Sequence, residues 1–82
     1  MEEILLSLKL NIIKAVNLDR KVENIKDDEQ IFGSGLGLDS IEALELIVML
    51  EKEYQLKIVS EDVANKIFVS VKTLAEYIQQ NS

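Results

Sequence analysis

The residues that could do chemistry are gathered in one stretch, GSGLGLDSIEALELIVMLEKEY, at positions 33 to 54. All three glycines of the chain lie within residues 33 to 37, directly before Asp39 and Ser40. Glycine permits backbone conformations and close approaches that other residues resist, so this concentration predicts a tight, specific loop. Asp39 and Glu42 have the spacing of a capping box, which predicts that a helix begins at Ser40. The positive end of a helix dipole stabilises anions such as phosphate, so the Ser40 hydroxyl is a candidate for a phosphate-linked modification.

No side chain in the sequence can activate Ser40 as a nucleophile by itself. The chain contains no His and no Cys, so neither a Ser–His triad nor a thiolate nucleophile can be built. The glycine pattern is neither a phosphate-binding Walker loop nor a dinucleotide fingerprint, and GxSxG is absent. We therefore expect no enzyme activity, although a reactive group attached to the chain could still take part in catalysis. The plainer interpretation of Ser40 is an ordinary exposed serine in a first helical turn.

The helix expected after Ser40 carries two apolar stripes on roughly opposite sides, at about 100° per residue. The first stripe consists of Ala43, Leu46, Ile47, Leu50 and Tyr54. The second stripe consists of Ile41, Leu44 and Val48, flanked by Glu42, Glu45, Glu51 and Lys52. A surface helix in a small domain needs only one apolar stripe. The second stripe is therefore either more core or a docking surface, and the surrounding carboxylates favour docking.

Length and charge limit the class of protein. The 82 residues predict a single domain, residues 1–82, and 48% hydrophobic residues with a net charge of −6 predict a globular fold with one modest core. Residues 23 to 62 hold 11 acidic against 3 basic side chains, a local net of −8. Such an acidic middle repels nucleic acid and anionic lipid, and attracts basic protein patches. The sequence shows neither a signal peptide nor a membrane span, so we expect a cytoplasmic protein. We also expect it to be a monomer.

The first half of the chain reads as a helix followed by a long connection. Residues 2 to 17 predict a helix with the core stripe Leu5, Leu8, Ile12, Ala15 and Val16. On that helix a weaker second stripe of Leu6, Leu10 and Ile13 is expected to be partly covered. Residues 18 to 38 form a long loop whose spaced apolar residues pin it to the core. Asp27 to Glu29 is interpreted as a solvated charge run, and no metal site is expected.

The second half predicts two more helices after a short link. Residues 55 to 59 are the link, and Ser60 caps a short helix that ends near Asn65. Ser70 caps the final helix, and residues 79 to 82 are expected to fray. The inward face of this helix is Val71, Leu74, Ala75 and Ile78. The predicted fold is all-α: a small four-helix bundle of three longer helices and one short one, with a long loop between the first and second.

The stretch GLGLDSIEALELIVMLEKEY resembles the signature of the acyl carrier proteins, in which a D-S-L/I tripeptide starts the second helix. LKIVSEDV and SVKTLAEYI extend the resemblance over essentially the whole chain. The family fold is a four-helix bundle with a long first connection. The resemblance implies that Ser40, beside the capping Asp39, carries 4′-phosphopantetheine transferred from coenzyme A by a separate phosphopantetheinyl transferase. Acyl groups are then bound as thioesters to the thiol of this arm, and family members often bury the acyl chain in the core of the bundle.

The resemblance also implies partners. In the family, the second helix docks acyl-loading and acyl-processing enzymes through basic patches on those enzymes. Carried over, the docking residues are Ile41, Glu42, Leu44, Glu45, Val48 and Glu51. Lys52 stands where common fatty-acid carriers have a further acid, and the loop is richer in glycine; these departures fit a carrier for a specialised acyl or polyketide pathway. The resemblance as a whole implies either fatty-acid synthesis or such a specialised pathway. A carrier of an aminoacyl or D-alanyl cargo, or an unmodified acidic helical interaction protein, are the alternatives.

Overall fold

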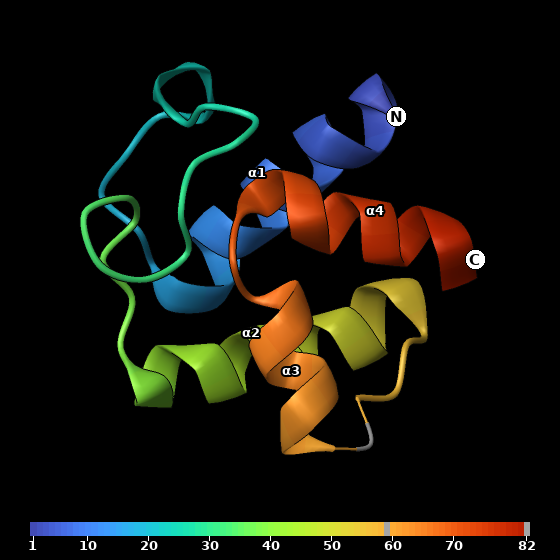
Figure 1. Cartoon of the computed structure of the whole chain (residues 1–82). Coiled ribbons are helices and arrows are strands. Elements are labelled where there is room, and N and C mark those ends of the chain that lie inside the picture. The colour runs from blue at the N-terminus through green and yellow to red at the C-terminus, as the bar shows by residue number, and fades with distance from the viewer. Residues whose placement is uncertain (59, 82) are drawn as a thin grey trace.

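The computed structural model describes residues 1–58 and 60–81, and these residues form a small helical bundle (Figure 1). Its elements are α1 (Glu2–Val16), the 3₁₀ helix η1 (Val22–Asn24), α2 (Ser40–Tyr54), α3 (Glu61–Ile67) and α4 (Val71–Asn81). The described residues contain no β-strand, only an isolated bridge between Gln30 and Ser70. None of the helices in this part of the chain is long and apolar enough to cross a membrane. The predicted all-α class, with three longer helices and one short, is confirmed.

The core forms where α1 packs against both α2 and α4. Leu8 and Ile12 of α1, Leu46 and Leu50 of α2, and Leu74 of α4 are all completely shielded from solvent. No polar or charged side chain in the described part of the chain is buried. Burial of apolar surface is the main favourable term in folding, so these contacts fix the relative positions of the three longer helices.

The outer side of α1 is more exposed than the sequence predicted. Leu5, Leu8 and Ile12 are buried as expected, with Ala15 and Val16 partly buried beside them. Leu6 and Leu10, however, are 52% and 44% exposed, so the prediction that they are partly covered is wrong. Only Ile13 of that weaker stripe packs against the core. The reason is geometric: α2, α4 and η1 contact α1 on its other sides.

The long loop between α1 and α2 is pinned to the bundle, as its spaced apolar residues predicted. Its buried side chains are Ile25, Ile31, Leu36 and Leu38. Two backbone hydrogen bonds add a tie that the sequence did not reveal. The Ile31 N–H donates to the Val69 carbonyl at 3.1 Å, and the Val71 N–H donates to the Glu29 carbonyl at 2.9 Å. These bonds hold the loop against the connection between α3 and α4, and thereby limit where α2 can begin.

The last two helices are capped as predicted but run further. The Ser60 hydroxyl accepts a hydrogen bond from the Val63 N–H at 3.2 Å, and the Ser70 hydroxyl accepts one from the Thr73 N–H at 3.1 Å. Helix α3 continues to Ile67, two residues beyond the predicted end, because Ile67 turns into the core. The inward face predicted for α4 is buried throughout.

The predicted fraying of the C-terminal tail is wrong for residues 79 to 81. Helix α4 continues through Asn81, whose side-chain amide donates to the Tyr77 carbonyl at 2.9 Å. Ile78, one turn earlier, is buried and holds this last turn against the bundle. Ser82, and Val59 in the predicted link, lie outside the described residues.

Candidate functional site

The loop before α2 needs glycine at all three of its glycine positions. Gly33 and Gly37 have φ angles of +70° and +69°, which side-chain-bearing residues rarely adopt. Gly35 packs so closely on Gln30 that an added Cβ would lie 2.2 Å from the Gln30 carbonyl oxygen. That same oxygen accepts a hydrogen bond from the Leu36 N–H at 2.8 Å. The loop is therefore folded back tightly on itself, as predicted, and its exit leads directly into α2.

Helix α2 begins at Ser40 with a complete capping box. The Glu42 N–H donates to the Asp39 carboxylate at 2.8 Å, and the Asp39 N–H donates to the Glu42 carboxylate at 3.1 Å. Both predicted partners are therefore present, and each satisfies an N–H that the helix itself leaves unbonded.

Ser40, the first residue of α2, is exposed to solvent. Its hydroxyl forms no hydrogen bond with the part of the chain that the structure describes. The position lies at the positive end of the α2 dipole, which suits a negatively charged phosphate group. An exposed, unbonded hydroxyl in this field is accessible and lies where a negatively charged group is stabilised.

A groove of about 640 Å³ opens beside Ser40, between α2 and α3. Ser40, Asp39, Ser60 and Asn65 supply its polar edge. Its apolar lining is Phe32, Leu38, Ala43, Leu44, Ile47, Ile58, Ala64 and Phe68. The sequence placed several of these residues near the core but did not predict this groove, because α3 comes next to α2 only through the tertiary fold. An apolar groove next to a hydroxyl is suited to hold a flexible apolar group linked to that hydroxyl.

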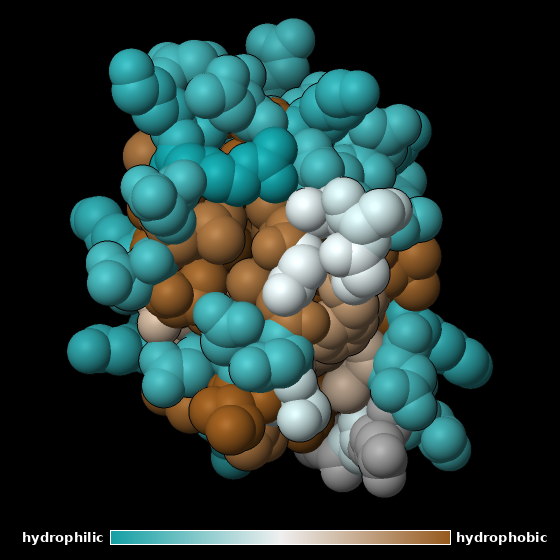
Figure 2. Space-filling model, turned by 90° about the vertical axis from the view of Figure 1, so that its left-hand side faces the viewer, coloured by the Kyte–Doolittle hydropathy of each residue, from teal (hydrophilic) through white to brown (hydrophobic). Residues whose placement is uncertain are grey.

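The two apolar stripes of α2 lie in opposite environments. In the first stripe, Leu46 and Leu50 are completely buried. In the second stripe, Ile41, Leu44 and Val48 are 69%, 62% and 60% exposed. Figure 2 shows the apolar surface on the face that includes the start of α2, bordered by hydrophilic side chains. The second stripe is therefore not additional core, and its exposure leaves it available for docking.

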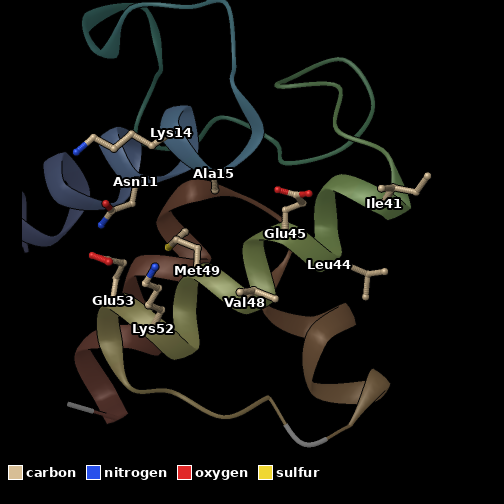
Figure 3. Close-up of a pocket in the computed structure, with 10 residues that line it drawn as sticks. All are labelled: Asn11, Lys14, Ala15, Ile41, Leu44, Glu45, Val48, Met49, Lys52 and Glu53. Carbon is tan, nitrogen blue, oxygen red and sulfur yellow. The ribbon is translucent and has the colours of Figure 1, made fainter.

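A second groove, of about 600 Å³, lies between α1 and α2 (Figure 3). The second stripe forms part of its α2 side, and Met49, which is buried, lies deeper. Its other lining residues are Asn11, Lys14, Ala15, Glu45, Lys52 and Glu53. The sequence assigned no role to Met49 or Lys14. Met49 is buried because it lies on the side of α2 against which α1 packs.

A polar cluster joins the end of α2 to α1. The Tyr54 hydroxyl lies 2.7 Å from the Ser7 hydroxyl and accepts a hydrogen bond from the Asn11 amide at 2.9 Å. Tyr54 was predicted as an apolar member of the first stripe, and its ring does pack against the core. Its hydroxyl adds a second fixed point for α2, at the opposite end from the capping box.

Comparison with known proteins identifies the family. The sequence model of the family described as phosphopantetheine attachment site matches residues 10–78. The chain is 36% identical over 80 residues to the acyl carrier protein of Karelsulcia muelleri (strain GWSS), an alignment that covers 98% of this chain and 90% of the relative. It is 34% identical over 74 residues to the acyl carrier protein of Onion yellows phytoplasma (strain OY-M), covering 90% and 93% of the two chains. The chain therefore belongs to the acyl carrier proteins of the phosphopantetheine-attachment family, which carry acyl groups as thioesters on a covalently bound phosphopantetheine.

Proposed function

We propose that Ser40 is the residue to which phosphopantetheine is attached. The observation that carries this proposal is the exposed, unbonded hydroxyl at the capped start of α2. The apolar groove beside it gives an attached arm and its cargo a surface to lie on. Residue 40 also lies within the part of the chain, residues 10–78, that matches the family.

The residues around Ser40 fix the start of α2, and none of the described ones is hydrogen-bonded to the Ser40 hydroxyl. The neighbouring carboxylate of Asp39 accepts a hydrogen bond from the Glu42 N–H and so serves the helix cap. We infer that the transferase supplies the base that removes the serine proton while the phosphopantetheinyl group is transferred from coenzyme A, whose adenosine 3′,5′-bisphosphate part leaves as the pyrophosphate bond breaks. Once attached, the arm supplies a terminal thiol, which this cysteine-free chain lacks.

The second stripe is proposed to dock the transferase and the acyl-loading and acyl-processing enzymes. Ile41, Leu44 and Val48 supply exposed apolar contacts, and the acidic side chains Glu42, Glu45 and Glu51 are placed to attract basic residues. Such contacts are expected to weaken with added salt, because exposed charges are screened over about 8–10 Å at physiological ionic strength. The whole chain, residues 1–82, is proposed to act as one carrier domain and as a monomer. A cytoplasmic location stays a prediction from the sequence.

Incubation with coenzyme A and a broad-specificity phosphopantetheinyl transferase tests the assignment of Ser40. Intact-mass measurement should show one added phosphopantetheine per chain, and none on the Ser40→Ala variant. Ser34, in the glycine loop, provides a matched control because it is also exposed. The Ser34→Ala variant should be modified fully. Modification of Ser40→Ala to the same extent as the parent protein would show that the arm is attached elsewhere.

A further inference from the structure

Residues 29–31 of the loop before α2 pair with the connection between α3 and α4. The Val71 N–H donates to the Glu29 carbonyl at 2.9 Å, and the Ile31 N–H donates to the Val69 carbonyl at 3.1 Å. Both partners in each bond are backbone groups, so the bonds fix the path of the chain and not only the direction of a side chain. The connection between α3 and α4 therefore has a defined position relative to the loop.

Residues 36–38 bond to the same segment. The Leu36 N–H donates to the Gln30 carbonyl at 2.8 Å, and the Leu38 N–H donates to the Ile31 carbonyl at 3.1 Å. Ile31 therefore takes part through both its N–H and its carbonyl. We call these four hydrogen bonds the backbone clamp, since they hold the residues directly before α2 and the α3–α4 connection on one common segment.

Three apolar residues that line the α2–α3 groove belong to the clamp or adjoin it. Leu38 is a donor in the clamp, Phe32 directly follows Ile31, and Phe68 directly precedes Val69. Leu38 and Phe68 are buried, and Phe32 is 38% exposed. A shift of any clamped segment would therefore move part of the groove lining relative to α2, which supplies other lining residues.

Gly35 allows the clamp to close. A Cβ added at this position would lie 2.2, 2.7 and 2.8 Å from the carbonyl oxygen, the nitrogen and the carbonyl carbon of Gln30. These are backbone atoms of the clamped segment, so they cannot move aside as the end of a flexible side chain could. The backbone of Gly35 does not have the left-handed conformation of Gly33, so lack of space alone excludes a side chain here.

We propose that the backbone clamp, closed by Gly35, positions the lining of the α2–α3 groove so that the groove holds the acyl chain of the loaded protein. This inference rests on the proposed attachment of the arm to Ser40. A chain that binds the groove only when the clamp is closed stabilises the closed form. By the same coupling, a loosened clamp weakens binding of the chain and exposes the thioester to water. Gly35 is thus a positioning residue, which acts on the acyl chain through the groove lining.

Protein loaded with an octanoyl group tests the proposal, with an acetyl group as the short control. A broad-specificity transferase attaches the loaded arm from the acyl form of coenzyme A. Hydroxylamine then converts the thioester to a hydroxamate and a free thiol, and intact mass follows the rate. Each rate is divided by that of the corresponding free acyl-coenzyme A. In the parent protein the octanoyl thioester should be cleaved more slowly than the acetyl one, because only the octanoyl chain has enough apolar surface to bind the groove. We call the ratio of the two rates the protection.

Gly35→Ala is the decisive variant, and Gly33→Ala is its control. Gly35→Ala should reduce the protection by about threefold to tenfold, the factor that corresponds to loss of one backbone hydrogen bond. Gly33→Ala strains a left-handed backbone but brings its Cβ no closer than 3.9 Å to its nearest neighbour, so it should keep the parent protection. The proposal is overturned if Gly35→Ala keeps full protection, if both variants lose it equally, or if the parent protein shows none.

Amide hydrogen exchange in the parent protein tests the clamp without any substitution. The Ile31 and Leu38 amides should exchange about threefold more slowly, or slower still, in the octanoyl form than in the acetyl form, because the bound chain shifts the population toward the closed clamp. The Leu56 N–H, which donates to the Leu50 carbonyl at 3.3 Å at the other end of α2, should exchange equally in both forms. Equal exchange at Ile31 and Leu38 in the two forms would overturn the proposal, whether or not Gly35→Ala folds.

The mass measurement on Ser40 separates this proposal from the proposed function. Gly35→Ala keeps Ser40 and its capping residues and should still accept one phosphopantetheine. Full modification with unchanged protection would refute only the role of the clamp. Absence of modification in the parent protein would refute the proposed function, and this inference with it.

Discussion

The two apolar stripes of α2 have similar composition but differ in solvent exposure. Leu46 and Leu50 of the first stripe are inaccessible to solvent, whereas each residue of the second stripe is at least 60% exposed. Hydrophobicity does not separate Leu46 from Leu44, since they are the same residue type two positions apart on one helix. The difference lies in the packing partners, because the first stripe faces α1 and the core cluster, whereas the second stripe faces two open grooves. Because an exposed apolar stripe contributes little to the core, we propose that it contacts other molecules.

The largest difference between the stripes should be found in unfolding experiments on Leu46→Ala. Truncation of a fully buried leucine leaves a cavity in the core, and the free energy of unfolding should fall by about 2–5 kcal/mol. Denaturant unfolding followed by circular dichroism measures this change. A loss below about 1 kcal/mol would mean that the first stripe contributes less to the core than its burial indicates.

Removal of the cap at the start of α2 should have the next largest effect. Asp39→Ala deletes the acceptor for the Glu42 N–H, and loss of such a cap costs about 0.5–2 kcal/mol of unfolding free energy. The cap fixes where α2 begins, and therefore which stripe faces the core. Asp28→Ala, at an exposed loop position, is the control and should leave stability unchanged. Equal effects of the two variants would argue against the capping box.

The polar cluster at the other end of α2 should contribute somewhat less. Tyr54→Phe keeps the ring in the core but removes the hydroxyl that contacts Ser7 and Asn11. Loss of these hydrogen bonds should reduce the free energy of unfolding by about 0.5–1.5 kcal/mol. Thermal or denaturant unfolding tests this value. An unchanged stability would mean that water replaces the hydroxyl at no cost, and that the cap alone orients the helix.

The smallest effect on stability is expected for Leu44→Ala. Because Leu44 is 62% exposed, the free energy of unfolding should change by no more than about 0.5 kcal/mol. The rate of phosphopantetheine transfer, kcat/KM, should nevertheless fall by about fivefold or more, the factor for an interface residue worth over 1 kcal/mol. A stability loss equal to that of Leu46→Ala would show that the second stripe is core after all. An unchanged transfer rate would remove Leu44 from the transferase docking surface.

The features predicted correctly from sequence depend on local chemistry. The glycine loop, the Asp39–Glu42 cap and the caps at Ser60 and Ser70 each involve residues only a few positions apart. Their geometry follows from backbone rules that apply before any tertiary structure forms. Periodicity likewise separated the two stripes of α2, although it could not decide whether the second was core or surface.

The features that the sequence did not reveal depend on contacts between distant segments. Met49 is buried because α1 packs against its side of α2. The periodic pattern of α2 did not specify on which side α1 would pack. The bond from Ile31 to Val69 joins two loops far apart in the chain. Leu6 and Leu10 are exposed because no described element covers them. Both grooves also require two helices to be placed side by side, which helix periodicity alone does not determine.

The most direct test of the central claim is mass spectrometry of the protein purified from its native host. Intact mass would show whether the chain carries phosphopantetheine, and fragmentation would locate the group in the sequence. We expect one phosphopantetheine per modified chain, linked to Ser40 in the GLGLDSIEAL segment. A chain that is entirely unmodified in its host, or one that carries the group on any other residue, would contradict the account.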